Sequence, residues 1–250
     1  MVSKDTYCKR VLGTLVCLLL AAFPAHAAQA RPLVLNTDGA PPHSGPNGTG
    51  FEDRIVAEAF RRIGVEVKLI ILPSERCLQN ANAGIDDGNY TRIAGLPLAQ
   101  YPNLIMVPEP VSELIFTVFT RSPDFNATTW ADLQGRHVGV VNGWKIVEMN
   151  LRNGQHLQRV RDEEATFALL DKGRVEAIVG GLYTGREIIR THGYQGMRAL
   201  SPPLATEPMY LYLNKRHAAL VPKLAEALRS MRRDGTQQRI TKAVMDGARQ

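Results

Sequence analysis

Short apolar runs alternate with amphipathic segments along the first part of the chain. Residues 32–38 (PLVLNTD) and 65–72 (VEVKLIIL) form runs of the length expected for buried strands. Between them, residues 51–63 carry apolar side chains at helical spacing, and Gly64 follows in the position of a helix cap. A strand, a helix and a second strand in this order predict parallel pairing, and therefore an α/β fold.

The segment 73–92, which follows the second strand, combines helix and turn signals. Ser74 has the chemistry of an N-cap, and Gly84 stands where the helix would end. Asp86-Asp87-Gly88 is typical of a turn that leads into the next strand. We therefore predict a short helix, a turn and a buried strand end, with polar side chains at the carboxyl edge of the sheet.

The same alternation begins again after a long apolar run at residues 112–121. Further strands are predicted at 137–142 and 175–180, and helical segments at 128–135, 144–151, 165–172 and 182–191. A second long strand is predicted at 208–214, before helices at 220–233 and 237–245. This pattern predicts two α/β lobes joined by two extended strands, with a cleft between the lobes.

The predicted lobes are not continuous in the sequence. We expect lobe 1 to comprise residues 31–112 and 207–250, and lobe 2 to comprise residues 119–206. The two long strands would connect the lobes as a hinge. A single sheet with no gap between its halves would contradict this interpretation.

The first 27 residues have the pattern of a secretory signal peptide. Lys4, Lys9 and Arg10 precede an apolar run, and Ala25-His26-Ala27 provides a small-residue cleavage site. The apolar run is too short to span a bilayer comfortably as a membrane anchor. We therefore expect cleavage of this segment and a periplasmic location.

Composition, charge and cysteine count argue against some classes of function. Of the 250 residues, 44% are hydrophobic and 22% are charged, as in ordinary globular chains. Removing residues 1–27 takes away three basic residues and one acidic residue, so the formal charge falls from +6 to +4. No helix face combines basic runs with aromatic residues, which argues against nucleic-acid binding. Cys77 is the one cysteine left, so we expect no internal disulfide and a thiol buried in a helix.

Two arginines stand near the carboxyl ends of predicted strands, where open α/β sheets bind ligands. A guanidinium holds an anion through paired hydrogen bonds, so Arg76 and Arg92 are candidates for anion capture. The alternatives are a salt bridge from Arg76 to Glu75 or Asp87, and a surface ion pair for Arg92. Asp38 ends the first strand, and it either accepts a hydrogen bond from a ligand or caps its turn.

Other candidate site residues come from turns and strand ends in both lobes. Tyr90 either stacks on the ligand or packs in the core. Asn142-Gly143-Trp144 leads from a strand into a helix, where free backbone N–H groups attract anions and Trp144 would cover an apolar part of the ligand. The alternative there is a tight turn with a buried Trp144. Gly181 and Tyr183 open the next helix in the same way, and Glu207 would meet a cationic group.

Three stretches resemble periplasmic solute-binding proteins of the polar-amino-acid type, solute-binding protein family 3, which serve ABC importers. The loop Ala40-Pro-Pro-His43 with Gly50-Phe51-Glu52 is similar to the first-strand loop and following helix of that family. Residues 130–143 (WADLQGRHVGVVNG) resemble its entry into lobe 2, and residues 210–217 with 220–235 resemble its return to lobe 1. The resemblance implies the type II fold, in which two lobes close on a small solute.

The chain departs from that family at the clamp for an α-amino acid. Members carry an arginine on a Thr-x-x-Arg pattern, whereas Gln100-Tyr101 stands at the corresponding place here. Members also carry an aspartate for the substrate ammonium, whereas this chain has Gly180-Gly181-Leu182. The resemblance is therefore to a divergent branch, and "polar amino acid" serves only as a family label.

Together these features predict an extracytoplasmic protein that captures a small polar solute, anionic or amino-acid-like, by lobe closure. It would act as a monomer without cofactor or metal and deliver the solute to an ABC transporter permease. The sequence has no nucleophile elbow, Walker loop or metal-type histidine spacing, so we expect no enzyme activity. The alternatives are a dehydratase-like enzyme on this scaffold, with Glu207 as general acid, and a sensory or accessory protein that docks on a membrane receptor.

Overall fold

A computed structural model describes residues 31–97, 99–151 and 156–247 of the chain. The expected signal peptide, residues 1–27, lies outside the described residues. Within the described part of the chain, no helix combines the length and the apolar composition needed to cross a membrane.

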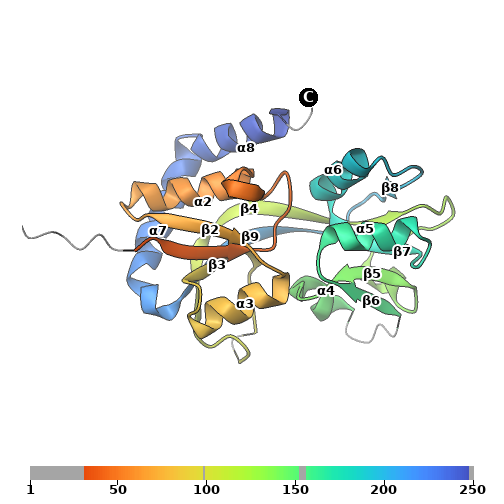
Figure 1. Cartoon of the computed structure of the whole chain (residues 1–250), viewed down its shortest axis with the longest axis horizontal. Coiled ribbons are helices and arrows are strands. Elements are labelled where there is room, and N and C mark those ends of the chain that lie inside the picture. Colours follow the sequence, from red (N-terminus) through yellow and green to blue (C-terminus); the bar gives the residue numbers. More distant parts are fainter. Residues whose placement is uncertain (1–30, 98, 152–155, 248–250) are drawn as a thin grey trace, which may run out of the picture. The chain divides into compact units, whose positions relative to one another are not determined.

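Lobe 1 contains a small parallel sheet in the order β2-β1-β3, with helices on both faces (Figure 1). Its strands are β1 (Leu33–Thr37), β2 (Val67–Ile71) and β3 (Gly88–Ile93), and its helices are α2 (Phe51–Arg62), α3 (Ser74–Ala83), α7 (Val221–Arg233) and α8 (Thr236–Gly247), with short 3-10 turns η1 (Pro46–Gly48) and η3 (Lys215–Leu220). Helix α2 packs against α7 and α8, whereas α3 packs against β1 and β3. The parallel pairing predicted for the first two strands is confirmed.

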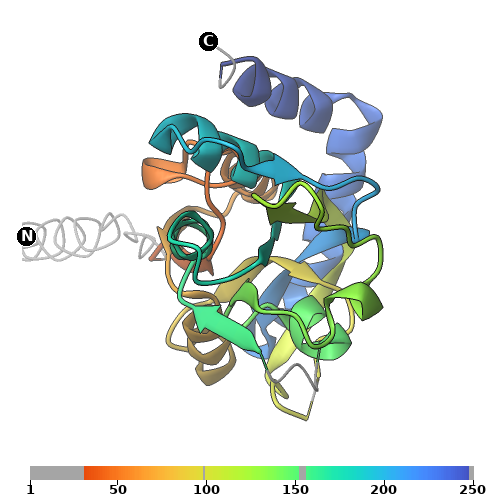
Figure 2. The same ribbon diagram turned by 90° about the vertical axis from the view of Figure 1, so that its right-hand side faces the viewer.

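Lobe 2 repeats this construction around β5, which pairs in parallel with both β6 and β7. Its strands are β5 (Val138–Val141), β6 (Leu157–Val160), β7 (Ala177–Gly181) and β8 (Arg198–Ala199), and its helices are α4 (Lys145–Asn150), α5 (Glu163–Asp171) and α6 (Leu182–His192), with the 3-10 turn η2 (Trp130–Leu133). Figure 2 faces this lobe and shows α5 nearly end-on.

Two long antiparallel strands connect the lobes. Strand β4 (Leu104–Thr120) pairs with β9 (Ala205–Asn214) from Leu104 opposite Asn214 to Phe116 opposite Ala205. The far end of β4 then pairs with β7 in lobe 2. Eight of the nine described strands therefore lie on one hydrogen-bonded path, and β8 pairs with β4 beside it, although a pocket remains between the lobes. The predicted hinge is confirmed, while the residue limits of the lobes stay predictions.

Each lobe has its own hydrophobic core. The lobe 1 core gathers apolar side chains from α2, α7 and the strands, including Leu35, Phe60 and Leu224. The lobe 2 cores lie on the two faces of its strands, with Val138 in one cluster and Phe167 in the other. These clusters share no residue, yet contacts between the lobes are frequent enough that Pro32–Gln250 forms one unit.

The structure differs from the sequence predictions at several local points. Strand β6 was not predicted, because its four residues are half-buried or exposed and show no apolar run. Pro73, rather than Ser74, is the N-cap of α3, and Ser74 is its first helical residue. Helix α5 begins at Glu163, because the side chain of Asp162 accepts a hydrogen bond from the Ala165 N–H.

The buried acidic turn at the end of α3 has a structural function. Asp86 accepts hydrogen bonds from the side chains of Asn36 and Asn80. Asp87 forms an ion pair with Arg216, and its Oδ1 lies 2.7 Å from Nε2 of His217. Cys77 is buried in α3 as expected, and burial raises the pKa of its thiol to about 12. A thiol with that pKa is protonated at neutral pH and is a poor nucleophile.

Candidate functional site

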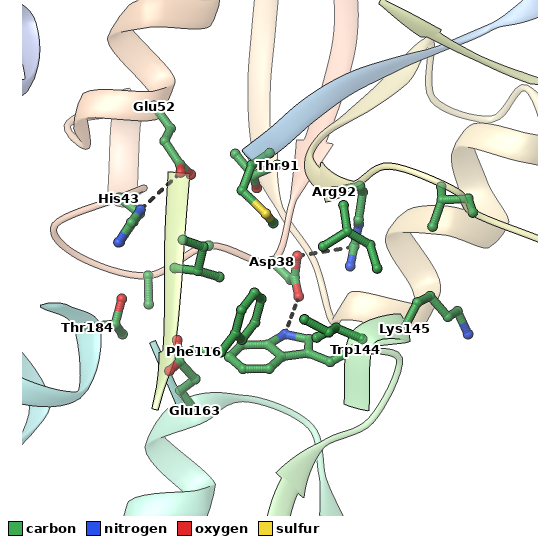
Figure 3. Close-up of a pocket in the computed structure, with 17 residues that line it drawn as sticks. Asp38, His43, Glu52, Thr91, Arg92, Phe116, Trp144, Lys145, Glu163 and Thr184 are labelled. Atoms are coloured by element: carbon green, nitrogen blue, oxygen red, sulfur yellow. Dashed lines mark hydrogen bonds and ion pairs between the residues drawn. The ribbon is translucent and has the colours of Figure 1, made fainter. Parts of the chain in front are cut away.

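A pocket lies between the two lobes and is lined by charged and polar side chains from both (Figure 3). Lobe 1 contributes the carboxyl end of β1, the loop after it, the start of α2 and the end of β3. Lobe 2 contributes the turn from β5 to α4 and the first turns of α5 and α6. The polar lining residues are Asp38, His43, Glu52, Thr91, Arg92, Lys145, Glu163 and Thr184, and Phe116 and Trp144 are its aromatic residues.

Asp38 connects the lobes at the centre of this pocket. Its Oδ1 lies 3.1 Å from Nη2 of Arg92 in lobe 1, and its Oδ2 accepts a 3.0 Å hydrogen bond from the Trp144 indole in lobe 2. The Trp144 ring meets Phe116 edge to face, with 5.5 Å between ring centroids. The structure thus brings three predicted site residues, Asp38, Arg92 and Trp144, into one pocket.

Arg92 is buried, and protein groups already occupy its guanidinium. Besides Asp38, it donates from Nε to Asn89, from Nη1 to the Ser74 hydroxyl and from Nη2 to the Ser74 carbonyl. The pairing of β3 with β9 shifts register between Asn89 and Arg92, and Thr91 in this irregularity has φ +66°. A β-branched residue rarely adopts that conformation, so the bulge marks a locally strained backbone beside the pocket.

The side chain of Lys145 extends from lobe 2 to a carboxylate of lobe 1 at another edge of the pocket. Its ammonium lies 2.8 Å from Glu75 of α3 and 2.9 Å from Glu148 of its own helix. Burial opposes the charged form, but hydrogen bonds to these two carboxylates outweigh it and raise the pKa of Lys145. Lys145 is therefore a permanent cation that two carboxylates neutralise.

Glu163 lies at the opposite side of the pocket, in the first turn of α5. Its Oε1 accepts a 2.7 Å hydrogen bond from the backbone N–H of Gly181. Burial raises the pKa of Glu163 to about 7, although this hydrogen bond and nearby His43 act in the other direction. The backbone donor that the sequence offered to a ligand at Gly181 is thus used by a carboxylate of the protein itself.

His43 faces the same part of the pocket from lobe 1. Its Nδ1 lies 2.9 Å from Oε1 of Glu52, which also accepts a 2.5 Å hydrogen bond from the Ser112 hydroxyl. Because a carboxylate can only accept, this contact assigns the hydrogen of neutral His43 to Nδ1 and leaves a lone pair on Nε2. Nε2 is buried and has no hydrogen-bond partner among the described residues.

Several predicted site residues lie outside the lining of the pocket. Arg76 is exposed on α3, because Ser74, Cys77, Leu78 and Ala81 form the buried face of that helix. Tyr90 is buried in the lobe 1 core, where its hydroxyl donates to Asp53 at 2.7 Å. The described residues that line the pocket also do not include five other predicted ones, Asn142, Gly143, Gly181, Tyr183 and Glu207.

Gly143 serves the contact between the lobes. It has φ +91°, and a Cβ at this position would lie 2.6 Å from the backbone nitrogen of Glu75 in lobe 1. The glycine therefore permits a close approach between the β5–α4 turn and the start of α3. Helix α4, which follows, has only six residues, and its first residue Lys145 pairs with carboxylates rather than leaving an anion site.

The sequence prediction missed six of the eight polar residues of the lining: His43, Glu52, Thr91, Lys145, Glu163 and Thr184. His43 and Glu52 stand in the loop and helix start that carried the family resemblance, nine positions apart. Glu163 and Thr184 open helices, where polar residues are common as caps, so no local signal separates them from structural residues.

The described residues contain no cluster of three or more His, Cys, Asp or Glu side chains suited to a metal ion. Each acidic group of the lining already has a protein partner: Asp38 bonds to Arg92 and Trp144, Glu52 to His43, and Glu163 to the Gly181 N–H. The arrangement offers hydrogen-bond acceptors and one aromatic surface to a small polar molecule.

No protein-family model matches the chain. A protein of Shewanella oneidensis, described as uncharacterized, is 24% identical over 193 residues, which cover 74% of this chain and 72% of that protein. At this level of identity, membership of solute-binding protein family 3 stays a prediction.

Solved structures with the same architecture are numerous. A histidine kinase sensor domain with similarity to periplasmic binding proteins has a TM-score of 0.76 at 19% identity, and covers 85% of this chain and 95% of that chain. An ancestral arginine-binding protein bound to arginine has a TM-score of 0.73 at 20% identity, with coverage of 85% and 97%. The arginine-, lysine-, histidine-binding protein ArtJ from Geobacillus stearothermophilus has a TM-score of 0.71 at 18% identity, with coverage of 88% and 100%. These likenesses, together with two α/β lobes joined by two strands, show that the chain has the type II periplasmic-binding-protein fold.

Proposed function

We propose that this protein is an extracytoplasmic solute-binding protein that holds a small polar, amino-acid-like solute between its two lobes. The observation that carries the proposal is a pocket whose polar lining comes from both lobes, with the Asp38–Trp144 hydrogen bond joining them. A ligand that contacts both sides of such a pocket favours the conformation in which the lobes meet.

We further propose that the protein delivers its solute to the permease of an ABC importer, as a monomer. The arginine-binding proteins that share its fold support binding of an amino-acid-like solute. A sensory function is the second candidate, because a histidine kinase sensor domain also shares this fold. In either case the pocket would perform the same task, and the partner that recognises the closed lobes would differ.

The first test is a thermal-shift screen of amino acids, organic acids and amines, followed by calorimetric titration of the best ligand. We expect Trp144→Phe to weaken that ligand about tenfold, because it removes the indole hydrogen bond to the Asp38 carboxylate and keeps an aromatic ring beside Phe116. Trp130→Phe is the matched control, since Trp130 packs against the lobe 2 core and does not line the pocket.

Two results would contradict solute binding in this pocket: no compound of the panel raises Tm, or Trp144→Phe and Trp130→Phe bind the best ligand equally well. Uptake of the radiolabelled ligand then separates the two candidate functions. Loss of uptake in cells that lack the protein supports transport. Unchanged uptake with a lost transcriptional response to the ligand supports sensing.

A further inference from the structure

We propose that Glu163, His43 and Thr184 form a subsite for a protonated primary amine, so that the solute enters this pocket with a cationic end rather than as an anion. The inference rests on the proposed function and names the chemical class of its ligand. The ligand charge inferred here is positive, whereas the two arginines suggested an anionic ligand when only the sequence was considered.

The permanent cations that line the pocket are already neutralised by the protein. Arg92 pairs with Asp38, and Lys145 pairs with Glu75 and Glu148. The lining contains three carboxylates, from Asp38, Glu52 and Glu163, against the two cations Arg92 and Lys145. An incoming anion would therefore have to displace existing ion pairs to reach either cation.

Glu163 is a carboxylate of this lining that forms no ion pair with a described residue. Among the described residues, the hydrogen-bond partner of its side chain is the backbone N–H of Gly181, which donates to Oε1. Burial is the main reason why the pKa of Glu163 rises to about 7, and it outweighs the opposing effects of the Gly181 hydrogen bond and of His43. A ligand ammonium would supply the missing counter-charge, and a hydrogen bond between two charged groups is stronger than one between neutral groups.

His43 supplies a second acceptor from the other lobe. The ring is 3% exposed, and its Nε2 is a buried polar atom without a described partner. In the neutral ring, the bond from Nδ1 to Glu52 selects the tautomer in which Nε2 accepts a hydrogen bond. Figure 3 shows this edge of the ring turned away from Glu52 and toward Thr184 and Glu163. Buried polar groups normally have partners, so this lone pair marks a place for a hydrogen-bond donor.

The number and the source of the acceptors fit a primary ammonium. That group has three N–H donors, and the subsite offers a carboxylate, an imidazole nitrogen and the Thr184 hydroxyl. His43 belongs to lobe 1, whereas Glu163 and Thr184 open α5 and α6 in lobe 2. One amine that bonds to both sides would hold the lobes together.

The test compares ligands that differ only in their end groups, within the thermal-shift panel described above. It includes 1,5-diaminopentane, 5-aminopentanoate and glutarate, and the N-acetyl derivative of every amine that binds. We expect the compounds that raise Tm to carry a primary amine, and N-acetylation to abolish their binding. Glu163→Gln should weaken the best amine ten- to a hundredfold by calorimetry, because it removes the charge and keeps an oxygen for the Gly181 N–H.

Glu164→Gln is the matched control, because Glu164 is the next residue of α5 and its side chain is 68% exposed. It should leave amine affinity unchanged. Glu163→Asp, which keeps the charge, provides a second variant if Glu163→Gln folds poorly, and it should retain the preference for amines over acids. An amine-free acid as the strongest ligand, or equal amine affinity in Glu163→Gln and Glu164→Gln, would overturn the inference. Failure of every compound to bind would instead contradict the proposed function.

Discussion

Single side chains in this pocket have their charge set by neighbours far away in the sequence. Arg92 is the clearest example, because its guanidinium contacts Asn89, Ser74 and Asp38 at once. An arginine with so many protein partners positions the backbone around it and has little capacity left for an anion. Glu163 is the opposite case, with a carboxylate that burial disfavours and that forms no ion pair with a described residue.

The raised pKa of Glu163 predicts a dependence of stability on pH. In the unfolded chain this carboxyl has its usual pKa of 4.5, and in the folded protein burial raises it to about 7. Its contribution to stability is therefore complete below pH 4.5 and is lost as the pH rises through 7. We expect Glu163→Gln to gain stability relative to wild type over this interval, by about 1–3 kcal/mol once partial exposure is allowed for.

Urea unfolding of both proteins at several pH values between 4 and 8 measures this difference. Glu164→Gln is again the control and should follow the wild-type curve in parallel. His43, Asp38 and Asp162 also influence Glu163 and remain in every variant, so the difference reports the titration of Glu163 in the presence of these groups. A constant difference between wild type and Glu163→Gln across this range would show that the folded carboxyl has an ordinary pKa.

At the scale of elements, the decisive contact is between the start of α3 and the turn from β5 to α4. Glu75 and Lys145 pair across it, and Gly143 lies against the Glu75 backbone. The two segments belong to different lobes, so their contact depends on how closely the lobes meet. A side chain at position 143 would clash with the Glu75 backbone, and separating the lobes would remove this clash without unfolding either lobe.

Gly143→Ala tests this view. Both Gly143 and Gly135 have positive φ, at +91° and +75°, so alanine at either position should cost about 1–2 kcal/mol of unfolding free energy. Only the Gly143 Cβ meets a neighbour, because nothing lies within 4 Å of a Cβ at Gly135. We expect Gly143→Ala alone to lose at least tenfold in ligand affinity by calorimetry. Wild-type affinity in Gly143→Ala would mean that this contact does not accompany ligand binding.

For the whole molecule, the separate cores predict that the lobes lose stability separately. Phe167 packs against Phe119 in lobe 2, with 4.9 Å between ring centroids, and belongs to no lobe 1 cluster. Phe167→Ala should cost about 3–5 kcal/mol, because it leaves a large cavity in a well-packed core. Hydrogen exchange should then accelerate for the amides of β5 and β7 and remain slow for those of β1 and β2.

Phe60→Ala is the reciprocal variant, since Phe60 is fully buried in the lobe 1 core. Its faster exchange should appear in β1 and β2 and spare lobe 2. Equal acceleration throughout the chain in either variant would show that the two lobes unfold as one cooperative unit.

The pattern of apolar and polar positions determined most of the architecture. It predicted the parallel strands of lobe 1, the two long crossing strands and the helices after them, because period and length are local properties of the chain. It missed β6, whose residues carry no apolar run, and the placement of Arg76, whose side of α3 depends on the face that the core buries. Asp38, Arg92 and Trp144 could be selected from the sequence because they lie at or just after the end of a strand or follow a turn glycine.

The tertiary structure decided which of these charges remain available to a ligand. Asp38 and Trp144 are 106 positions apart, and Glu75 and Lys145 are 70 positions apart, so no local pattern reveals either pair. The same holds for Glu163, whose lack of an ion pair with the described residues follows from where α5 meets the pocket. Local periodicity determines the elements, but charge compensation acts through space over a few ångströms, and only the folded chain brings the compensating groups within that range.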